Sequence, residues 1–235
     1  MEELFNEVQK YIESGDWVAV MTWAEEHHET TDFEIAAKVM ECYKLCMAQN
    51  IPEAYLDLGT FYYNGVFVEQ DYKKAFELYK VAADAGVLRA ICNCGYCFYY
   101  GRHQEKDYVK AFEYFNKGAL LFDDVNCLYK IGDMYLNGYA TDKNENYAFI
   151  MYQRALDQIG ENDMYCQADV YFRLGKCYLY GIGTEKDAEQ ANRFLAIALL
   201  GFYDRRRIDP FVKGLIASTK KMIDEARAEL DGEIL

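Results

Sequence analysis

The sequence predicts an all-α fold, an α/α solenoid wound as a right-handed superhelix, with about four helix–turn–helix repeats and a helical cap at each end. Three observations predict it. A pair of glycines six residues apart recurs four times, small and large apolar residues follow each pair at helical spacing, and the 235 residues hold only two prolines. A supersecondary unit repeated at such a period buries its apolar face by stacking on its neighbours.

The repeat is defined by its glycines. The first glycine of each pair is 36, 37 and 43 residues from the next, and these positions are Gly59, Gly95, Gly132 and Gly175. The second glycines are Gly65, Gly101, Gly138 and Gly181. An alanine lies ten residues further on in every block, at Ala75, Ala111, Ala148 and Ala191.

The first helix of a repeat contains the first glycine. Tyr55, Leu58, Gly59 and Tyr62 fall at i, i+3, i+4 and i+7, which is one face of a helix. Glycine inside a helix costs roughly 1 kcal/mol against alanine, so we expect a neighbouring helix backbone to approach closely there. The second glycine is expected to end the helix in the left-handed conformation.

The second helix is expected to begin near an acidic residue, which suits a helix N-terminus. The residues in this position are Asp71, Asp107 and Asp187, with Asn144 in the third block. An alanine, an aromatic residue and an alanine then recur at i, i+4 and i+7, as in Ala75, Tyr79 and Ala82. Small residues let the two helices pack closely, and the ring fills the space between repeats.

The chain divides into three predicted parts. Residues 1–52 are an acidic helical cap, with helices at 2–14, 16–28 and 32–49, the last belonging to a degenerate repeat. Residues 53–203 hold the repeats, at about 53–88, 89–125, 126–167 and 168–203. Residues 204–235 contain a capping helix over 210–230, which starts at Asp209-Pro210. The third repeat is longer than the second, and the extra residues are expected near 160–164.

These residues resemble the Sel-one-like repeat family, which is related to the tetratricopeptide repeat. Residues 54–86 are similar to the family pattern, Gly181-Ile-Gly183 matches its G-x-G loop, and His103 departs from that loop. The resemblance implies an interaction scaffold. For some secreted cysteine-rich relatives, β-lactam binding or hydrolysis has been proposed, and their helices are joined through cysteines at the paired-alanine position. That position holds Ala83, Ala119, Leu156 and Leu199, so this property does not carry over.

Charge limits the classes of partner. The formal net charge is −14, and residues 1–50 hold eleven acidic against three basic residues. An acidic chain repels phosphate backbones, so no nucleic-acid partner is expected. No stretch approaches the roughly 18 apolar residues of a membrane span. The acidic start, without an apolar segment after it, does not resemble a signal peptide, so we expect a cytoplasmic protein.

Candidate chemical motifs are better explained by the repeat. Cys94 and Cys97 form a C-x-x-C, but they take the positions of Leu58 and Phe61 in the first repeat, so we expect reduced core cysteines. Adjacent histidines on a helix point about 100° apart, so His27-His28 is interpreted as a solvated helix end. We therefore expect no catalytic residue, no metal site and no cofactor.

The first-helix surface is the candidate binding site. In related repeats the first helices line the concave side, and here the face opposite the packing stripe carries rings among single charges. Such surfaces are typical of peptide binding, since tyrosine offers contact area at a low entropy cost. The candidate residues are Tyr63, Arg89, Tyr96, Tyr99, Tyr129, Phe172, Lys176 and Tyr180. The alternative is that these tyrosines pack on one another between repeats.

Three functions follow as hypotheses. The favoured one is a non-catalytic scaffold or adaptor that binds a peptide or protein segment on the concave face. The second is a hydrolase-type enzyme or enzyme subunit with the groove as active site. The third is a self-assembling solenoid whose caps join two copies as a homodimer.

Overall fold

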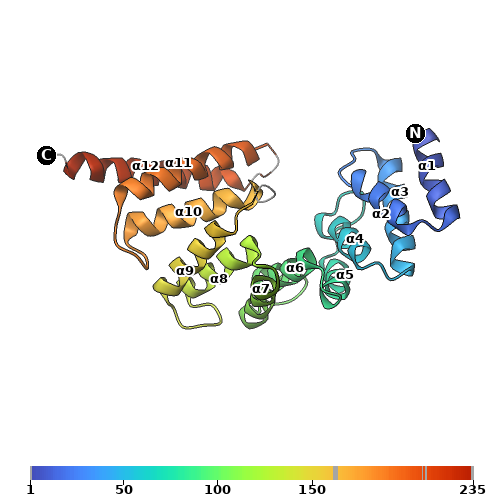
Figure 1. Cartoon of the computed structure of the whole chain (residues 1–235), viewed down its shortest axis with the longest axis horizontal. Helices are drawn as coiled ribbons and strands as arrows, with labels where there is room; N and C mark the ends of the chain where they lie inside the picture. The colour runs from blue at the N-terminus through green and yellow to red at the C-terminus, as the bar shows by residue number, and fades with distance from the viewer. Residues whose placement is uncertain (1, 161–163, 208, 210, 234–235) are drawn as a thin grey trace. The chain divides into compact units, whose positions relative to one another are not determined.

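The computed structural model describes residues 2–160, 164–207, 209 and 211–233. In this part of the chain there are twelve α-helices and no strand (Figure 1). The chain forms two compact units, residues 1–114 and 115–235.

The first unit contains six whole helices and the start of a seventh. They are α1 (Glu2–Ser14), α2 (Trp17–Glu26), α3 (Phe33–Ala48), α4 (Pro52–Asn64), α5 (Tyr72–Asp84), α6 (Leu88–Tyr100) and the beginning of α7 (Tyr108–Phe122). Consecutive helices pack on one another, from α1 on α2 through α5 on α6. The core of the cap is made of side chains from α1 to α4, with Val39, Tyr43 and Cys46 fully buried at the degenerate-repeat positions.

The second unit contains the end of α7 and five further helices. These are α8 (Val125–Asn137), α9 (Glu145–Asp157), α10 (Met164–Tyr180), α11 (Ala188–Arg205) and α12 (Val212–Glu233). Figure 1 shows α10, α11 and α12 side by side, and α11 packs on both of its neighbours. The core between them contains Leu195, Ala198 and Phe202 of α11 and Val212, Ile223 and Ala226 of α12.

Each repeat turns through the same loop. The second glycine ends the first helix in the left-handed conformation, with φ between 68° and 70° in all four repeats. Six residues later an acid or amide side chain accepts a hydrogen bond from the first turn of the next helix, at Asp71, Asp107, Asn144 and Asp187. Both sequence predictions are thus confirmed, and Asn144 caps its helix as the aspartates do.

A second left-handed residue lies two positions after that glycine in every loop. Its φ is 62° at Phe67, 63° at His103, 61° at Ala140 and 67° at Gly183. Only one of the four loops therefore has glycine where the conformation favours it. Residues with a Cβ are strained in this region by roughly 1–2 kcal/mol. The His103 departure from the G-x-G pattern changes the residue and keeps the backbone.

Three of the repeat glycines, Gly59, Gly132 and Gly175, lie against the second helix of their own hairpin. A Cβ at Gly132 would stand 2.7 Å from Cδ1 of Tyr152 and 3.1 Å from the Ala148 carbonyl oxygen. A Cβ at Gly59 would meet the ring of Tyr79 in the same way. The expected close approach is therefore confirmed, but the nearest atoms belong to a side chain and the backbone is second.

One prediction about a helix end is wrong, and two others fall partly outside the described residues. The helix expected over 16–28 ends at Glu26, and the prediction of a solvated end at His27-His28 is wrong because both side chains are half-buried. The ring of His27 stacks on Trp23 at 4.4 Å, and His28 Nδ1 lies 2.9 Å from the Tyr43 hydroxyl. The expected helix start at Asp209-Pro210 includes Pro210, which lies outside the described residues, and α12 begins at Val212. Of the extra residues expected near 160–164, residues 161–163 also lie outside the described part of the chain.

Candidate functional site

The candidate residues of the first unit lie on α4 and α6. Arg89, Tyr96 and Tyr100 share one face of α6, since they are seven and eleven residues apart. The rings of Tyr96 and Tyr100 stack at 6.0 Å, and Tyr99 meets Tyr100 edge-on at 5.0 Å. Arg89 has 73% of its side chain exposed. This helix therefore presents a group of rings with a cation two turns away.

Tyr63 on α4 is as enclosed as Tyr96 and Tyr99 on α6, whereas Tyr100 is exposed. Tyr63 is half-buried, its ring meets Tyr72 at 5.2 Å, and the Arg102 guanidinium lies 6.0 Å from its centre. Burial raises the pKa of the Tyr63 hydroxyl, although its hydrogen bond and attraction to Arg102 act the other way. Tyr63 thus packs against Tyr72 of its own repeat and against Arg102 of the second repeat.

A buried carboxylate lies beneath Arg89. Asp57 of α4 is 7% exposed, and its Oδ1 is 3.9 Å from Arg89 Nη1. Burial raises the pKa of Asp57 to about 6, while the positive charge of Arg89 lowers it. The Arg89 guanidinium therefore pairs with Asp57 while most of the Arg89 side chain remains exposed to solvent.

The candidate residues of the second unit differ in exposure. Tyr129 of α8 is only 6% exposed, and its hydroxyl donates to Asn126 Oδ1 at 3.1 Å. Phe172 of α10 is half-buried against Phe202 at 5.9 Å, and Lys176 is half-buried. Tyr180 is exposed, and its hydroxyl donates to Glu225 Oε2 of α12 at 2.7 Å. Lys176 and Tyr180 are thus the candidates nearest to solvent on α10, one turn apart.

A network of ion pairs joins the first helices of this unit. The Arg173 guanidinium donates twice to Asp133, from Nε to Oδ1 and from Nη2 to Oδ2, both at 2.6 Å. Tyr152 of α9 also donates to Asp133 Oδ1, at 2.9 Å, and Lys130 Nζ lies 3.5 Å from its Oδ2. Burial would raise the pKa of Asp133, but Arg173, Lys130 and the Tyr152 hydroxyl outweigh it and hold that pKa below its usual range.

The network extends along α10 to α11. Arg173 Nη1 lies 3.6 Å from Asp169 Oδ1, and Arg205 donates to the other oxygen of Asp169. The guanidinium of Arg173 also covers the ring of Tyr129, 4.5 Å from its centre. The first helices of this unit therefore carry charged as well as aromatic side chains, and the ring of Tyr129 packs against the Arg173 guanidinium of the network.

Asp57 and Arg173 were missed among the candidates, yet the sequence carries a signal for them. The residue two positions before the first glycine is polar in every repeat, at Asp57, Asn93, Lys130 and Arg173. Of these, Asp57 and Lys130 are buried and Arg173 has 17% of its side chain exposed. A polar residue repeated beside a buried glycine indicates a paired charge, because an unpaired one is costly there.

The cysteines have the environment of core residues. All eight are buried and free of disulfide bonds. Burial raises the pKa of the thiols of Cys42, Cys97 and Cys177 to about 12. A thiol with so high a pKa is a poor nucleophile at neutral pH, which disfavours redox chemistry at Cys97.

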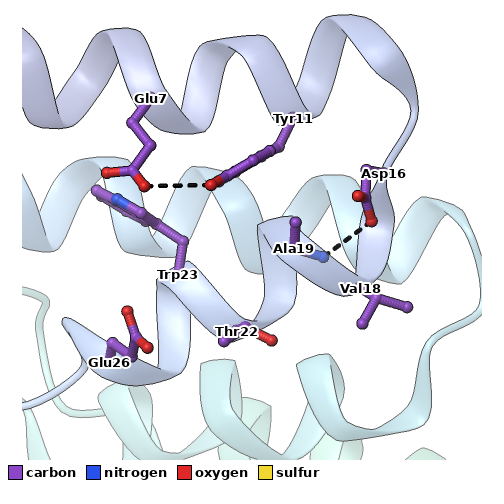
Figure 2. Close-up of a pocket in the computed structure, with 8 residues that line it drawn as sticks. All are labelled: Glu7, Tyr11, Asp16, Val18, Ala19, Thr22, Trp23 and Glu26. Atoms are coloured by element: carbon purple, nitrogen blue, oxygen red, sulfur yellow. Dashed lines mark hydrogen bonds between the residues drawn. The ribbon is translucent and has the colours of Figure 1, made fainter.

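A pocket opens between α1 and α2 in the cap (Figure 2). Its volume is about 410 Å³, and it is lined by Glu7, Tyr11, Asp16, Val18, Ala19, Thr22, Trp23 and Glu26. Three of these eight residues are exposed acids. From the sequence, this surface is predicted only to be acidic.

The comparison with protein families accounts for the repeat. The family described as Sel1 repeat matches residues 52–87, 88–121, 125–158 and 168–200, which is more than half of the chain. The chain belongs to the Sel1 repeat family. The resemblance stated from the glycine and alanine register is thereby confirmed, as is the all-α solenoid of Sel1 repeats.

Solved Sel1-repeat structures share the fold. A Sel1 repeat protein from Oxalobacter formigenes is 21% identical over 69% of this chain and 64% of its own, with a TM-score of 0.60. The protein c5321, a protective antigen of uropathogenic Escherichia coli strains with an SLR fold, is 18% identical over 95% of this chain and 56% of its own, with a TM-score of 0.61. This chain therefore spans less than two thirds of either.

A third similar structure comes from an assembly. A chain of the APC/C hetero-tetramer Cut9–Hcn1 is 18% identical over 95% of this chain and 41% of its own, with a TM-score of 0.60. No curated protein sequence matched significantly. Within the described ranges, none of the helices is long and apolar enough to cross a membrane.

Proposed function

We propose that this Sel1-repeat protein is a non-catalytic interaction scaffold that binds a peptide or protein segment on its first-helix surface. Sel1 and tetratricopeptide-like repeat proteins are generally protein-interaction scaffolds. The similar chain in the Cut9–Hcn1 hetero-tetramer belongs to a protein assembly, which supports a protein partner for this chain.

The observation that carries the proposal is the surface of α6. Arg89 projects into solvent above Asp57, and Tyr96, Tyr99 and Tyr100 form a group of rings further along the same helix. A tyrosine ring loses few rotamers on binding, and a guanidinium offers paired donors to a carboxylate. A segment with apolar side chains and one acidic group fits this combination.

The second unit carries candidate binding residues of its own. Lys176 and Tyr180 supply a cation and an exposed ring one turn apart on α10, with Phe172 packed beside them in the core. Tyr129 and Tyr63 belong to the same set, but their enclosure means that loss of either ring should also lower stability.

Catalysis has little support in the site. The buried thiols have raised pKa values, and Asp133 is held ionised by Arg173 and Lys130. A general acid or base needs a pKa near the working pH, and Asp57 has one, but Asp57 is buried beneath Arg89. We therefore favour binding over the alternative of a hydrolase-type active site.

The environment of the cysteines also supports a reducing cellular compartment. Eight buried free thiols suit a reducing compartment, where disulfides are rare. We place the protein in the cytoplasm on this ground. The strongly acidic composition supports a protein rather than a nucleic-acid partner.

The test is affinity capture with matched variants. Tyr99→Ala and Arg89→Ala should each weaken capture of the partner about tenfold, since central aromatic and arginine contacts dominate such interfaces. Tyr147→Ala, which removes an exposed ring from α9, is the control and should bind as the wild type does. If Tyr99→Ala lowers the melting temperature while the folded fraction binds normally, the ring is a packing residue and the proposed surface is wrong.

A further inference from the structure

The pocket of the cap has an unusual composition. Glu7 comes from α1, Asp16 from the turn and Glu26 from the end of α2, and all three are exposed around one opening (Figure 2). Tyr11 and Trp23 supply its aromatic wall, and Val18, which is 78% exposed, forms an apolar edge. Carboxylates beside aromatic faces are the surroundings that a guanidinium prefers.

Within the cap, Glu7 Oε1 accepts a hydrogen bond from the Tyr11 hydroxyl and Asp16 Oδ1 accepts one from the Ala19 N–H (Figure 2), but among the described residues no cation pairs with the pocket carboxylates. In residues 1–50, the one ion pair that the described structure holds joins Lys38 to Glu41, away from the pocket. Trp23 is 3% exposed, and among the described residues its Nε1–H has no acceptor. A buried donor without an acceptor is costly, so a partner that brings a carbonyl oxygen as well as a cation would satisfy both needs. Since Nε1 is shielded from water, an exposed neighbouring side chain must shift to admit that oxygen.

The chain carries a surface of the opposite character in its second unit. Leu200, Tyr203, Arg206, Arg207, Phe211 and Lys220, here called the basic patch, come from the end of α11 and the region of α12. Leu200 and Tyr203 share one face of α11, Arg207 follows two residues after its end, and Arg206 and Lys220 lie 5.8 and 5.5 Å from the ring of Tyr203. Phe211 is 87% exposed and Leu200 is 67% exposed, so apolar area accompanies the charge.

We propose that the acidic pocket of one copy binds the basic patch of a second copy of this chain, so that the protein associates head to tail. Arg206 and Arg207 meet Glu7 and Glu26, and the exposed apolar side chains Phe211 and Val18 cover each other. A main-chain carbonyl of Arg206 or Arg207, which lie just beyond the end of α11, is the acceptor for Trp23 Nε1–H.

A second copy is favoured over another partner by complementarity within one sequence. The net charge of −14 repels copies at long range, so only a contact that pairs local opposite charges can bring them together. The basic patch and the cap pocket provide such a pair, and each copy carries both. This contact uses neither α4 nor α6, so it is independent of the proposed peptide surface.

The experiment measures the molar mass of the full chain by sedimentation at increasing concentration, in about 0.1 M salt, where the Debye length is roughly 10 Å. We expect the mass to rise above that of one chain, and to return to one chain at about 1 M salt, where the Debye length is roughly 3 Å. A single-chain mass at every concentration in 0.1 M salt overturns the proposal, and so does association unchanged by salt.

Charge reversal identifies the surfaces. Glu7→Lys/Glu26→Lys and Arg206→Glu/Arg207→Glu should each weaken association about tenfold or more. An equimolar mixture of the two variants should restore it, because each reversed surface then meets its complement. The control for the first variant is Glu77→Lys/Glu113→Lys, which makes the same change in net charge as Glu7→Lys/Glu26→Lys, at exposed positions on α5 and α7, and should associate at least as well as the wild type.

Circular dichroism and thermal melting establish that each variant is folded. Association that survives both reversals, or a mixture that stays monomeric, overturns the proposal. A cap that binds an arginine-rich peptide while the chain itself stays monomeric also overturns it, and would assign the pocket to a different basic protein. None of these outcomes depends on whether Tyr99 or Arg89 captures a peptide.

Discussion

At the residue scale, the most informative positions are those with a strained backbone conformation or a buried ionisable group. Ala140, His103 and Phe67 occupy a left-handed conformation that glycine holds in the fourth repeat, at Gly183. Asp57 is a carboxyl group whose buried position favours the protonated form. Each such residue lowers stability locally, and each can be tested by a single substitution.

The first prediction concerns Ala140. Replacing it with glycine should stabilise the second unit by about 1 kcal/mol, because the left-handed strain of roughly 1–2 kcal/mol exceeds the entropy cost of glycine. Ala140 is exposed, so packing changes little. Urea denaturation measures the change. The control is Ala217→Gly, at an exposed position within α12, which should destabilise instead. A destabilised Ala140→Gly would mean that the loop does not strain this residue.

The second prediction concerns Asp57 and pH. Its folded pKa, about 6, is above the ordinary value of 3.8, so the folded state binds the proton more tightly than the unfolded state. The stability that this proton contributes is fully present below pH 3.8 and is lost as pH rises through 6. Asp57→Asn should therefore gain stability relative to the wild type between pH 5 and pH 7.5. Denaturation curves at both pH values test this, and a difference that does not grow with pH contradicts it.

At the scale of elements, the first helices of the second unit are held together by the Arg173–Asp133 pair as well as by apolar packing. Removing one partner of a buried pair leaves an uncompensated charge, whereas removing both is far less costly. If the fold depends on the ion pair, a variant that lacks one partner should therefore be less stable than a variant that lacks both.

The third prediction follows from that asymmetry. Arg173→Met should destabilise the second unit by about 3–5 kcal/mol, while Arg173→Met/Asp133→Asn should recover only part of the loss, because Lys130 Nζ, 3.5 Å from Asp133 Oδ2, then loses that carboxylate. The double-mutant cycle is read from denaturant unfolding at neutral pH. Because the folded pKa of Asp133 lies below its usual value, its contribution is present above that value and is lost as pH falls through the folded pKa. The cost of Arg173→Met should therefore shrink in acid, and a cost independent of pH would contradict the role of the ion pair.

The elements were largely predictable, and the reasons are local. The caps at Asp71 and Asp187, the left-handed glycines and the three helices of the cap depend on residues close in sequence, so spacing alone indicates them. The charge network was not predicted because Arg173 and Asp133 are 40 residues apart and meet only when α8 and α10 pack. The histidines were misjudged for the same reason, since His28 finds Tyr43 on another helix.

At the scale of the whole molecule, the repeat architecture decides how a local change spreads. Each helix packs mainly on the next one or two in the chain, as α10 does on α9 and α11, so stability is close to a sum over neighbouring units. A defect in one repeat should then weaken that repeat and its neighbours rather than the entire chain. This differs from a globular domain, where loss of one core contact is shared by all elements.

The fourth prediction uses Gly132 to test this. Gly132→Leu places a side chain where a Cβ alone would meet the ring of Tyr152 and the carbonyl of Ala148, so α8 and α9 must move apart at a cost of about 1–3 kcal/mol. Native-state hydrogen exchange should show faster exchange of amides in α8, α9 and α10, with α1, α2 and α3 unchanged, because few contacts carry the loss that far along the array. Gly214→Leu is the control, since nothing lies within 4 Å of a Cβ there. Uniformly faster exchange in every helix of Gly132→Leu would show that the chain unfolds as one cooperative block, and unchanged exchange in α8 and α9 would show that the repeat glycine does not need to be small.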